Sequence, residues 1–289
     1  MTTQPVCLVL TRPLWQGAPD ILAGELLAGA RQTLPAHWSL RVVSAPLQRL
    51  IPLGQAPYEP EPLHAGVGRR LLVATSPASV EALGILPTPG AALFAQIASD
   101  PSRWVLTGVG EASCTALLNW FESQRPNTSH TALAPQAPEV WRMPAPLGSG
   151  AEPFLRWLSD RTAALSEGAE ARLLEAQENQ PFLAEGLASL GIPSRRLALY
   201  RRVACPMPMI APRASEGVGL VVSSSTVVES AIAGLTAQAL NPRGVVWMTH
   251  HPRIAEALTA ALGIEIAPMI EGLGALQILS GMARLNFRV

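Results

Sequence analysis

The sequence contains no lysine, because all 21 of its basic residues are arginine. This absence excludes a lysine Schiff base, a pyridoxal-phosphate anchor, a P-loop lysine and a kinase-type lysine. Aspartate is scarce: Asp20, Asp100 and Asp160 are the only three, too few for a DxD metal site or an EF-hand loop. We therefore expect a function that needs neither a lysine nor a bound metal.

Cysteine is also scarce, and long apolar runs are missing. Cys7, Cys114 and Cys205 lie far apart and form no CxxC motif, which argues against a disulfide framework and favours a reducing compartment. No apolar run approaches the roughly 18 residues of a membrane span. The N-terminus lacks the basic flank of a signal peptide. We expect a cytoplasmic protein with no membrane partner.

Neither sign of charge is in excess. The 21 basic residues balance 21 acidic ones, so no global field attracts nucleic acid or an anionic lipid surface, and we expect no nucleic-acid partner. Charged residues make up only 15% of the chain and hydrophobic residues 48%, which excludes disorder of the whole chain. At 289 residues, the length fits one large domain or two ordinary ones.

What the sequence does contain is a repeated unit, in which a short apolar run precedes a helix-like segment. The apolar runs are Val6–Leu10, Leu71–Ala74, Trp104–Leu106, Arg172–Leu174, Leu220–Val222 and Val245–Met248. The helix-like segments after them are Ile21–Ala30, Val80–Leu83, Ala116–Phe121, Phe182–Leu190, Val227–Leu235 and Ile254–Leu262. This alternation predicts an α/β fold with parallel sheets, and the continuously apolar strands predict burial on both faces.

Six such units exceed the needs of one compact sheet, so we expect two α/β domains. The breaks between units, rich in proline or small polar residues, cover 52–66, 122–151 and 205–217. Leu40–Ala45 and Leu197–Val203 alternate like exposed strands and could pair as connectors. The first domain would then be discontinuous, a connectivity that periodicity alone does not establish.

Small hydroxylated residues occur where the predicted strands run into helices: Thr11, Thr75, Ser76, Ser113, Ser223, Ser224, Ser225 and Thr226. Ligands of open α/β sheets bind at these ends, where unpaired N–H groups of the first helical turn favour anions. Taken singly, each residue is also an ordinary helix N-cap. Together with Arg12, directly after the first strand, the group predicts several anion-binding loops at the carboxyl ends of the strands.

Two further patterns have weaker functional readings. The stretch Gly108-x-Gly110-x-x-Ser113 is a near miss of the dinucleotide fingerprint, but no acidic residue follows where a ribose partner belongs. It predicts a tight turn, and an oxidoreductase is the less favoured interpretation. His250-His251 has no nearby Asp or Cys, and adjacent residues of a strand point to opposite faces, so we expect no zinc site.

The chain has two tyrosines, Tyr58 in the proline-rich break and Tyr200. Tyr200 stands before Arg201 and Arg202 at the end of a predicted connector strand. Its phenol is either a hydrogen-bond donor at an anionic site or a partly exposed side chain of a strand. The residues alone favour neither reading.

Six motifs follow one another along nearly the whole chain. They are Thr11-Arg12-Pro13, Leu71–Val80, Val109–Cys114 with Leu117-Leu118, Leu183-x-x-x-Leu187-x-x-x-Gly191 leading to Tyr200-Arg201-Arg202, Val221–Val227, and His251–Ala255 with Leu258 and Gly263. The ordered set resembles the uroporphyrinogen-III synthase family, in which similar apolar strands precede TSxxAV and GxxTAxxL patterns and one strand ends in YxR.

The resemblance implies two α/β domains joined by a two-stranded connector, with the active cleft between them. We expect a discontinuous domain of residues 1–44 plus 204–289 and an inserted domain of residues 45–203. The implied enzyme is a cofactor-free lyase of tetrapyrrole (haem) biosynthesis. It removes water from hydroxymethylbilane, inverts ring D through a spiro intermediate and closes the type III macrocycle. Catalysis would consist mostly of positioning a flexible substrate.

The resemblance also implies roles for single residues. Tyr200 matches the tyrosine proposed to assist departure of the hydroxyl, and Ser113 matches a hydroxyl-bearing position of the cleft. The expected substrate-binding set is Thr11, Arg12, Thr75, Ser76, Ser113, Ser224, Ser225, Thr226 and His251. We expect a monomer whose partners are its substrate and, transiently, neighbouring enzymes of the pathway.

The chain departs from the family pattern at two places. Glu175–Gln180 stands where the family often has a glycine-rich loop with arginine, and its two carboxylates would repel an anionic substrate. In the last motif, His251 replaces glycine and Ile254 replaces a hydroxylated residue. A family member that has lost the activity, and a two-lobed protein that binds an anion without chemistry, are therefore the alternatives.

Overall fold

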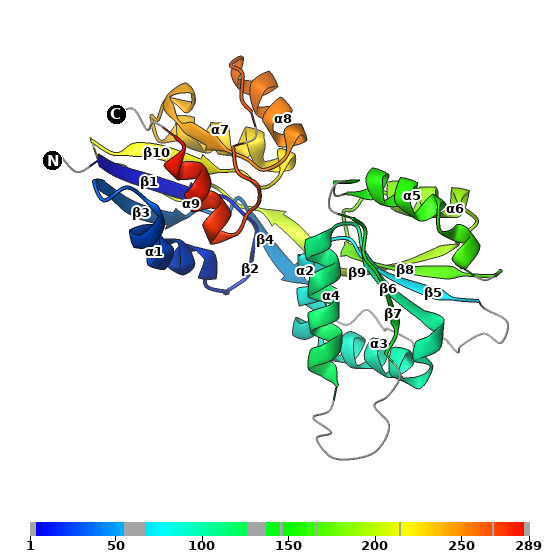
Figure 1. Ribbon diagram of the computed structural model, residues 1–289. Helices are drawn as coiled ribbons and strands as arrows, with labels where there is room; N and C mark the ends of the chain where they lie inside the picture. Colours follow the sequence, from blue (N-terminus) through cyan, green and yellow to red (C-terminus); the bar gives the residue numbers. More distant parts are fainter. Residues whose placement is uncertain are drawn as a thin grey trace. The chain divides into compact units, whose positions relative to one another are not determined.

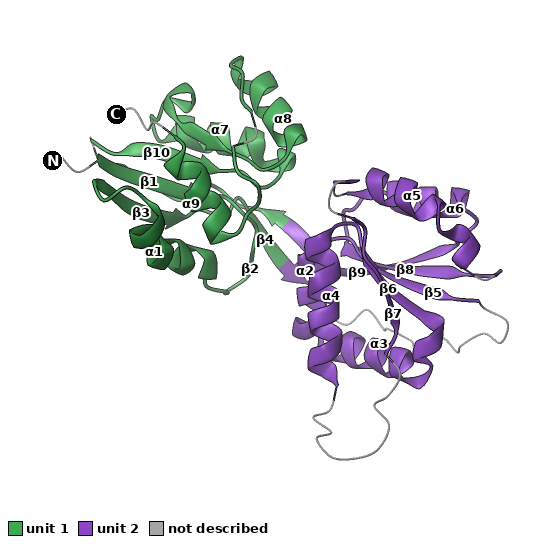
Figure 2. Cartoon of the chain, viewed as in Figure 1, with its two compact units in different colours: residues 1–50, 203–289 green, residues 51–202 purple. Residues whose placement is uncertain are grey.

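The computed structural model describes residues 4–54, 68–125, 137–144, 147–148, 150–165, 167–213, 215–267 and 269–285. The chain divides into two compact units, residues 1–50 with 203–289 (unit 1) and residues 51–202 (unit 2) (Figure 1, Figure 2). The division expected from the sequence changes domain at 44/45 and 203/204. Tyr58 lies outside the described residues.

Unit 1 is built around a parallel sheet with the strand order β11-β10-β1-β3. Its strands are β1 (Gln4–Leu10), β3 (Trp38–Ser44), β10 (Gly217–Val221) and β11 (Val246–Met248), and a two-residue strand β2 (Leu14–Trp15) follows β1. Its helices are α1 (Ile21–Thr33), α7 (Val228–Ala237), α8 (Pro252–Leu262) and α9 (Ala275–Ala283). The predicted strands and helices of this part are confirmed.

The central strand of unit 1 is buried on both faces, as its continuous apolar run predicts. Val6 and Leu8 pack on α1 and α9, in a cluster that includes Leu26 and Leu279. Val9 points to the opposite face and joins the cluster formed by α7 and α8. Helices therefore cover both sides of this sheet, and its loops are left at the strand ends.

Unit 2 contains five neighbouring strands in the order β9-β8-β5-β6-β7, and β4 (Gln48–Pro52) and β2 continue this sheet beyond β9. The five are β5 (Arg70–Ala74), β6 (Trp104–Gly108), β7 (Glu139–Trp141), β8 (Glu170–Ala176) and β9 (Ser194–Ala204). The helices are α2 (Pro77–Ile85), α3 (Pro87–Ser99), α4 (Glu111–Gln124), α5 (Ala151–Ser159) and α6 (Phe182–Ser189). The pairs β5–β6, β5–β8, β6–β7 and β8–β9 are parallel, so the predicted fold class is confirmed.

The core of unit 2 lies on both faces of its sheet. Leu71 and Val73 of β5 pack with Phe154 and Trp157 of α5 and with Leu187 of α6. On the other face lie α2, α3 and α4, which contact one another (Figure 1). The residues at the strand ends, rather than the strands themselves, are thus available for a ligand.

The connector strands differ from the sequence-based expectation. The pairing of Leu40–Ala45 with Leu197–Val203 is wrong, because Leu40 lies in β3, which pairs with β1 inside unit 1. The strand beside β9 is β4 (Gln48–Pro52). Cys205 N–H donates to Leu47 O (2.9 Å) and Leu53 N–H donates to Leu199 O (3.0 Å), so the two segments run antiparallel.

Among the described helices, no single one is long and apolar enough to cross a membrane. The helices α2 and α3 reach that length and composition only when counted as a pair, and the pair is bent by 105°.

Candidate functional site

The first group of predicted residues lies at the carboxyl ends of β5 and β8 in unit 2. Thr75 follows β5, and its hydroxyl donates to Leu174 O (2.8 Å). Ser76 is the N-cap of α2 and accepts a hydrogen bond from Ser79 N–H (3.2 Å) in a capping box, directly before Pro77. This local sequence starts the helix at the sheet edge and brings the Ser76 hydroxyl to it.

Tyr200 lies within β9 and not at its end, and its side chain is buried, with 1% of its surface exposed. Its hydroxyl is 3.2 Å from Ser76 Oγ and accepts a hydrogen bond from Arg202 Nη2 (3.1 Å). The reading of a partly exposed strand tyrosine is therefore wrong. The fold brings Tyr200 and Ser76 together across 124 positions of sequence.

In the Glu175–Gln180 stretch, one of the two carboxylates is paired with an arginine. Glu175 is the penultimate residue of β8, is 2% exposed and forms an ion pair with Arg196. Both oxygens of Glu178 accept from the backbone N–H of Arg202 (3.2 Å each). Asn179 Oδ1 accepts from Arg202 Nη1 (3.2 Å). Strand β9 therefore supplies the arginines that the stretch itself lacks.

Ser113 lies one strand further along the same sheet edge, in the first turn of α4, and is buried. Its turn is tight, as predicted: a Cβ on Gly108 would lie 2.5 Å from the backbone nitrogen of Cys114. Gly110 is the N-cap of α4, and β6 pairs with β5. The N-termini of α2 and α4 thus follow adjacent strands, and the Tyr200 hydroxyl lies beside the first of them, 3.2 Å from Ser76 Oγ.

In unit 1, Thr11 and Arg12 follow β1 as predicted, and both are engaged by the protein. Thr11 is fully buried, and its hydroxyl donates to Val221 O (2.8 Å). Arg12 forms an ion pair with Asp20 (2.6 Å). Asp20 also accepts from the Ser44 hydroxyl (2.7 Å). The Arg12 guanidinium at the carboxyl end of β1 is therefore already neutralised by a carboxylate of the chain itself.

The turn after β10 carries the predicted hydroxyl residues Ser224, Ser225 and Thr226. Ser224 is the N-cap of a one-turn 3-10 helix that begins at Ser225. Its Oγ lies 2.8 Å from Thr226 Oγ1, which also accepts from Gln48 Nε2 (3.3 Å). These contacts order the turn, and N-capping accounts for Ser224.

The two histidines lie beyond the end of β11, so the predicted placement of their side chains on opposite faces of a strand is wrong. His251 is the N-cap of α8, and its Nδ1 accepts from Arg253 N–H (3.2 Å). Burial lowers the pKa of His250, and neighbouring His251 lowers it further. His250 Nδ1 and Ser223 Oγ are buried polar atoms without a hydrogen-bond partner in the described part of the chain. No role for His250 could be predicted from the sequence.

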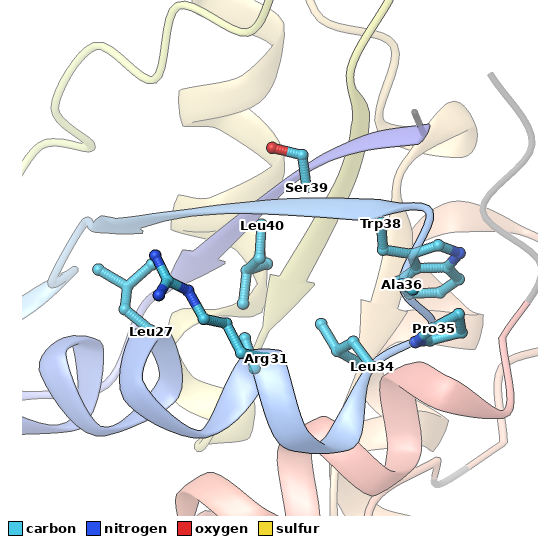
Figure 3. Close-up of a pocket in the computed structure, with 9 residues that line it drawn as sticks. Leu27, Arg31, Leu34, Pro35, Ala36, Trp38, Ser39 and Leu40 are labelled. Carbon is cyan, nitrogen blue, oxygen red and sulfur yellow. The ribbon is translucent and has the colours of Figure 1, made fainter. Parts of the chain in front are cut away.

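A hollow of about 460 Å³ lies in unit 1, away from these residues. It is bounded by Leu27, Arg31 and Leu34 at the end of α1 and by Trp38 and Leu40 at the start of β3 (Figure 3). The predicted site residues other than Tyr200 follow the carboxyl ends of strands, whereas this hollow is at the amino end of β3, and none of the predicted residues lines it. Among the described residues, no group of three or more His, Cys, Asp or Glu side chains could hold a metal ion.

The fold is similar to that of solved uroporphyrinogen III synthases. A mutant enzyme from the extremely thermophilic bacterium Thermus thermophilus matches with 18% sequence identity and a TM-score of 0.50, over 91% of each chain. The synthetase from Helicobacter pylori matches with 14% identity and a TM-score of 0.49, over 94% of this chain and 99% of that one. No family model and no curated protein matches the sequence. At 18% identity, the first likeness shows a shared fold, which confirms the fold that the motifs implied.

Proposed function

We propose that the chain is a uroporphyrinogen-III synthase, a lyase that converts hydroxymethylbilane to uroporphyrinogen III with ring D inverted. The observation that carries this proposal is the buried Tyr200 hydroxyl, held between Ser76 Oγ (3.2 Å) and Arg202 Nη2 (3.1 Å) at the carboxyl edge of the sheet. The fold shared with the T. thermophilus enzyme over 91% of each chain supports it. The arrangement provides an acid beside a surface suited to anions.

In this proposal Tyr200 acts on the leaving hydroxyl group. The phenol gives its proton to that oxygen while the carbon–oxygen bond breaks with its electron pair on oxygen, and water departs. The adjacent pyrrole nitrogen supplies electrons to the carbon that is left. The α carbon of ring D that carries the bridge to ring C attacks that carbon and gives the spiro intermediate. The bond from this α carbon to the old bridge then breaks, its electron pair returns to ring D, and the bridge carbon is left electron-poor on ring C. The other α carbon of ring D bonds to the bridge carbon and loses its proton, and the phenolate takes up a proton again, so the protein is unchanged.

The substrate's carboxylates would be held at helix N-termini. In unit 2 these are the first turns of α2 and α4, behind Thr75, Ser76 and Ser113. In unit 1, His251 opens α8, and Ser224, Ser225 and Thr226 line the neighbouring turn. Thr11 and Arg12 would hold the loop after β1 in one conformation, since both already bind protein groups.

We also propose that the protein works as a cytoplasmic monomer, without cofactor, metal, nucleic acid or membrane. The contacts with neighbouring enzymes of the pathway would be transient. Size-exclusion chromatography with light scattering checks the monomer. An added chelator, which should leave the rate unchanged, checks the independence from metal.

The decisive experiment is a coupled assay. Hydroxymethylbilane is generated in place, and the oxidised products are separated into type I and type III isomers. We expect type III in excess over the enzyme-free control. Tyr200→Phe should lower the rate on the order of 100-fold, and Tyr58→Phe, which removes the other tyrosine, should leave it unchanged.

Type I alone from a folded sample would refute the synthase and leave the two alternatives, a family member without the activity or an anion-binding protein. Tight binding of a polycarboxylate without turnover would then favour the second. Full activity in Tyr200→Phe would refute the role of that residue and leave the activity itself standing.

A further inference from the structure

Arg202 is held on three sides by residues of unit 2. Its backbone N–H donates to both oxygens of Glu178 (3.2 Å each). Nη1 donates to Asn179 Oδ1 (3.2 Å), and Nη2 donates to the Tyr200 hydroxyl (3.1 Å). The guanidinium also lies over the Tyr200 ring, 5.5 Å from its centroid. These contacts fix one arginine rotamer against one phenol.

The direction of the bond to Tyr200 has a chemical consequence. A guanidinium has five N–H donors and no acceptor, so the phenol oxygen must accept from Arg202. The phenol proton therefore points away from the guanidinium, and Ser76 Oγ lies within hydrogen-bond distance of the phenol oxygen (3.2 Å). A charged donor on the same oxygen also stabilises negative charge that develops there when the proton leaves.

The turn after β8 helps to hold the Arg202 side chain against Tyr200. Asn179 Nδ2 lies 3.5 Å from Thr75 Oγ1, and Asn179 O accepts from Arg196 Nη2 (2.6 Å). Asn179 is thereby fixed from β5 and β9 while its Oδ1 holds Arg202. The carboxylates of this turn meet arginine or backbone N–H groups. Glu178 and Asn179 of the acidic stretch therefore support Arg202.

We propose that Arg202 is the positioning residue of the reaction: it keeps the Tyr200 hydroxyl in the proton-donating orientation and stabilises the phenolate that forms. This inference rests on the proposed role of Tyr200 as the acid. Glu178 and Asn179 act one step further out, by holding Arg202.

The neighbouring Arg201 is a matched control. It carries the same charge on the same strand, and its side chain is exposed, whereas strand alternation puts Tyr200 and Arg202 on the other face. Arg202→Gln and Arg201→Gln remove the same charge, so the two variants differ in the contacts of the Arg202 guanidinium with Tyr200 and Asn179. Arg202→Lys keeps the charge and the backbone bond to Glu178, but it lacks the fork that reaches both Asn179 and Tyr200.

The first measurement needs no turnover. Tyrosine labelled with carbon-13 at Cζ gives two resonances, because the chain has two tyrosines, and Tyr58→Phe assigns them. The Cζ shift reports hydrogen bonding at the phenol oxygen. We expect the Tyr200 resonance to move in Arg202→Gln and Arg202→Lys, and to stay in place in Arg201→Gln. An unmoved resonance in folded Arg202→Lys would overturn the proposal.

The second measurement is the rate of type III formation. Loss of a charged hydrogen bond in the transition state predicts a fall in kcat of roughly 10- to 100-fold for Arg202→Gln. KM should change little, because the lost contact is to Tyr200. Equal rates in Arg202→Gln and Arg201→Gln would overturn the proposal. If the natural sequence makes no type III isomer while the resonance moves, the proposed function fails and the orientation of Tyr200 by Arg202 still holds.

Discussion

The ion pair between Arg41 and Glu216 makes the stability of unit 1 depend on pH. Arg41 lies on β3, and its Nη2 is 2.6 Å from Glu216 Oε2, directly before β10. The Glu216 side chain is only 2% exposed and also accepts from Arg213 N–H (2.9 Å). The hydrogen bond with Arg41 is the largest cause that lowers the pKa of Glu216, from 4.5 to about 2.

The size of the effect follows from this shift. A carboxylate whose pKa is lower in the folded state contributes stability that is complete above the unfolded pKa and is lost as the pH falls through the folded pKa. The shift from 4.5 to about 2 corresponds to a contribution of about 2–3 kcal/mol at pH 7, after allowance for the one-third exposure of Arg41. At pH 3 the same calculation gives a contribution of about 1 kcal/mol to the free energy of unfolding.

Glu216→Gln tests this reasoning, since glutamine has the shape of the protonated acid. Urea unfolding, followed by tryptophan fluorescence and circular dichroism, gives the free energy of unfolding of both proteins at pH 7 and pH 3. We expect their difference to be about 2–3 kcal/mol at pH 7 and to shrink by more than half at pH 3.

The control is Glu152→Gln, which breaks an exposed pair with Arg156 (3.0 Å) on α5. Its side chains are 72% and 77% exposed, so the change in the free energy of unfolding should stay near or below about 0.5 kcal/mol. A difference for Glu216→Gln that is the same at both pH values, or as small as the control, would refute the assignment.

Two further outcomes follow from burial. Gly108→Ala should lower the free energy of unfolding in urea by more than about 1 kcal/mol, because the new Cβ would lie 2.5 Å from the Cys114 nitrogen. The control is Gly24→Ala on α1, where nothing lies within 4 Å of the new Cβ, and this change should be neutral or stabilising. Equal effects of the two substitutions would contradict the close packing at Gly108. Iodoacetamide should label Cys205 of the native protein first, because burial raises the pKa of Cys7 to about 11 and also raises that of Cys114. Peptide mapping by mass spectrometry checks this order, and faster labelling of Cys7 would contradict it.

The strands that the sequence predicts well are those whose pattern has one physical cause. Leu71–Ala74 is apolar at every position because β5 is buried on both faces, and Thr75 and Ser76 mark its end by starting α2. Where such a strand ends and the next helix begins depends only on residues that are close together in the sequence. Local sequence therefore suffices to find the strand–helix repeat.

The connector was misplaced because one pattern has two causes. Leu40–Ala45 alternates because β3 is the last strand of its sheet in unit 1, and an edge strand is covered less completely than a central one. A connector strand alternates for the same reason. Which of the two applies depends on the strand that pairs with it, and that information lies far away in the sequence.

The helix α3 went unpredicted because its prolines resemble a break. Pro87 and Pro89 stand in the first turn, where the missing N–H costs nothing. Gly90 lets α3 approach the end of α2 closely, since a Cβ there would lie 2.5 Å from Leu83 O. The signal was therefore present, but proline at the start of a helix and proline in a loop look alike in the sequence.

The candidate site shows the same limit. That Thr75, Ser76 and Ser113 stand at strand ends could be predicted, because each follows an apolar run. That Arg202 and Tyr200 form one group with Ser76 could not, because it requires the strand order β9-β8-β5. The charge of Glu175 was misread for the same reason, since its partner Arg196 belongs to the next strand.

The discontinuity of unit 1 sets an order for its assembly during synthesis. β1 is paired on one side by β10, and the two strands are separated by the whole of unit 2. The first 50 residues can therefore complete their sheet only after residues 217–221 have left the ribosome. Unit 2 has its own core and is finished earlier, with Leu53 and Leu199 already joined by a hydrogen bond near its ends. A nascent chain stalled between these points would hold a folded inner domain and a β1 that is paired by β3 alone, with the edge that later receives β10 still open to chaperones.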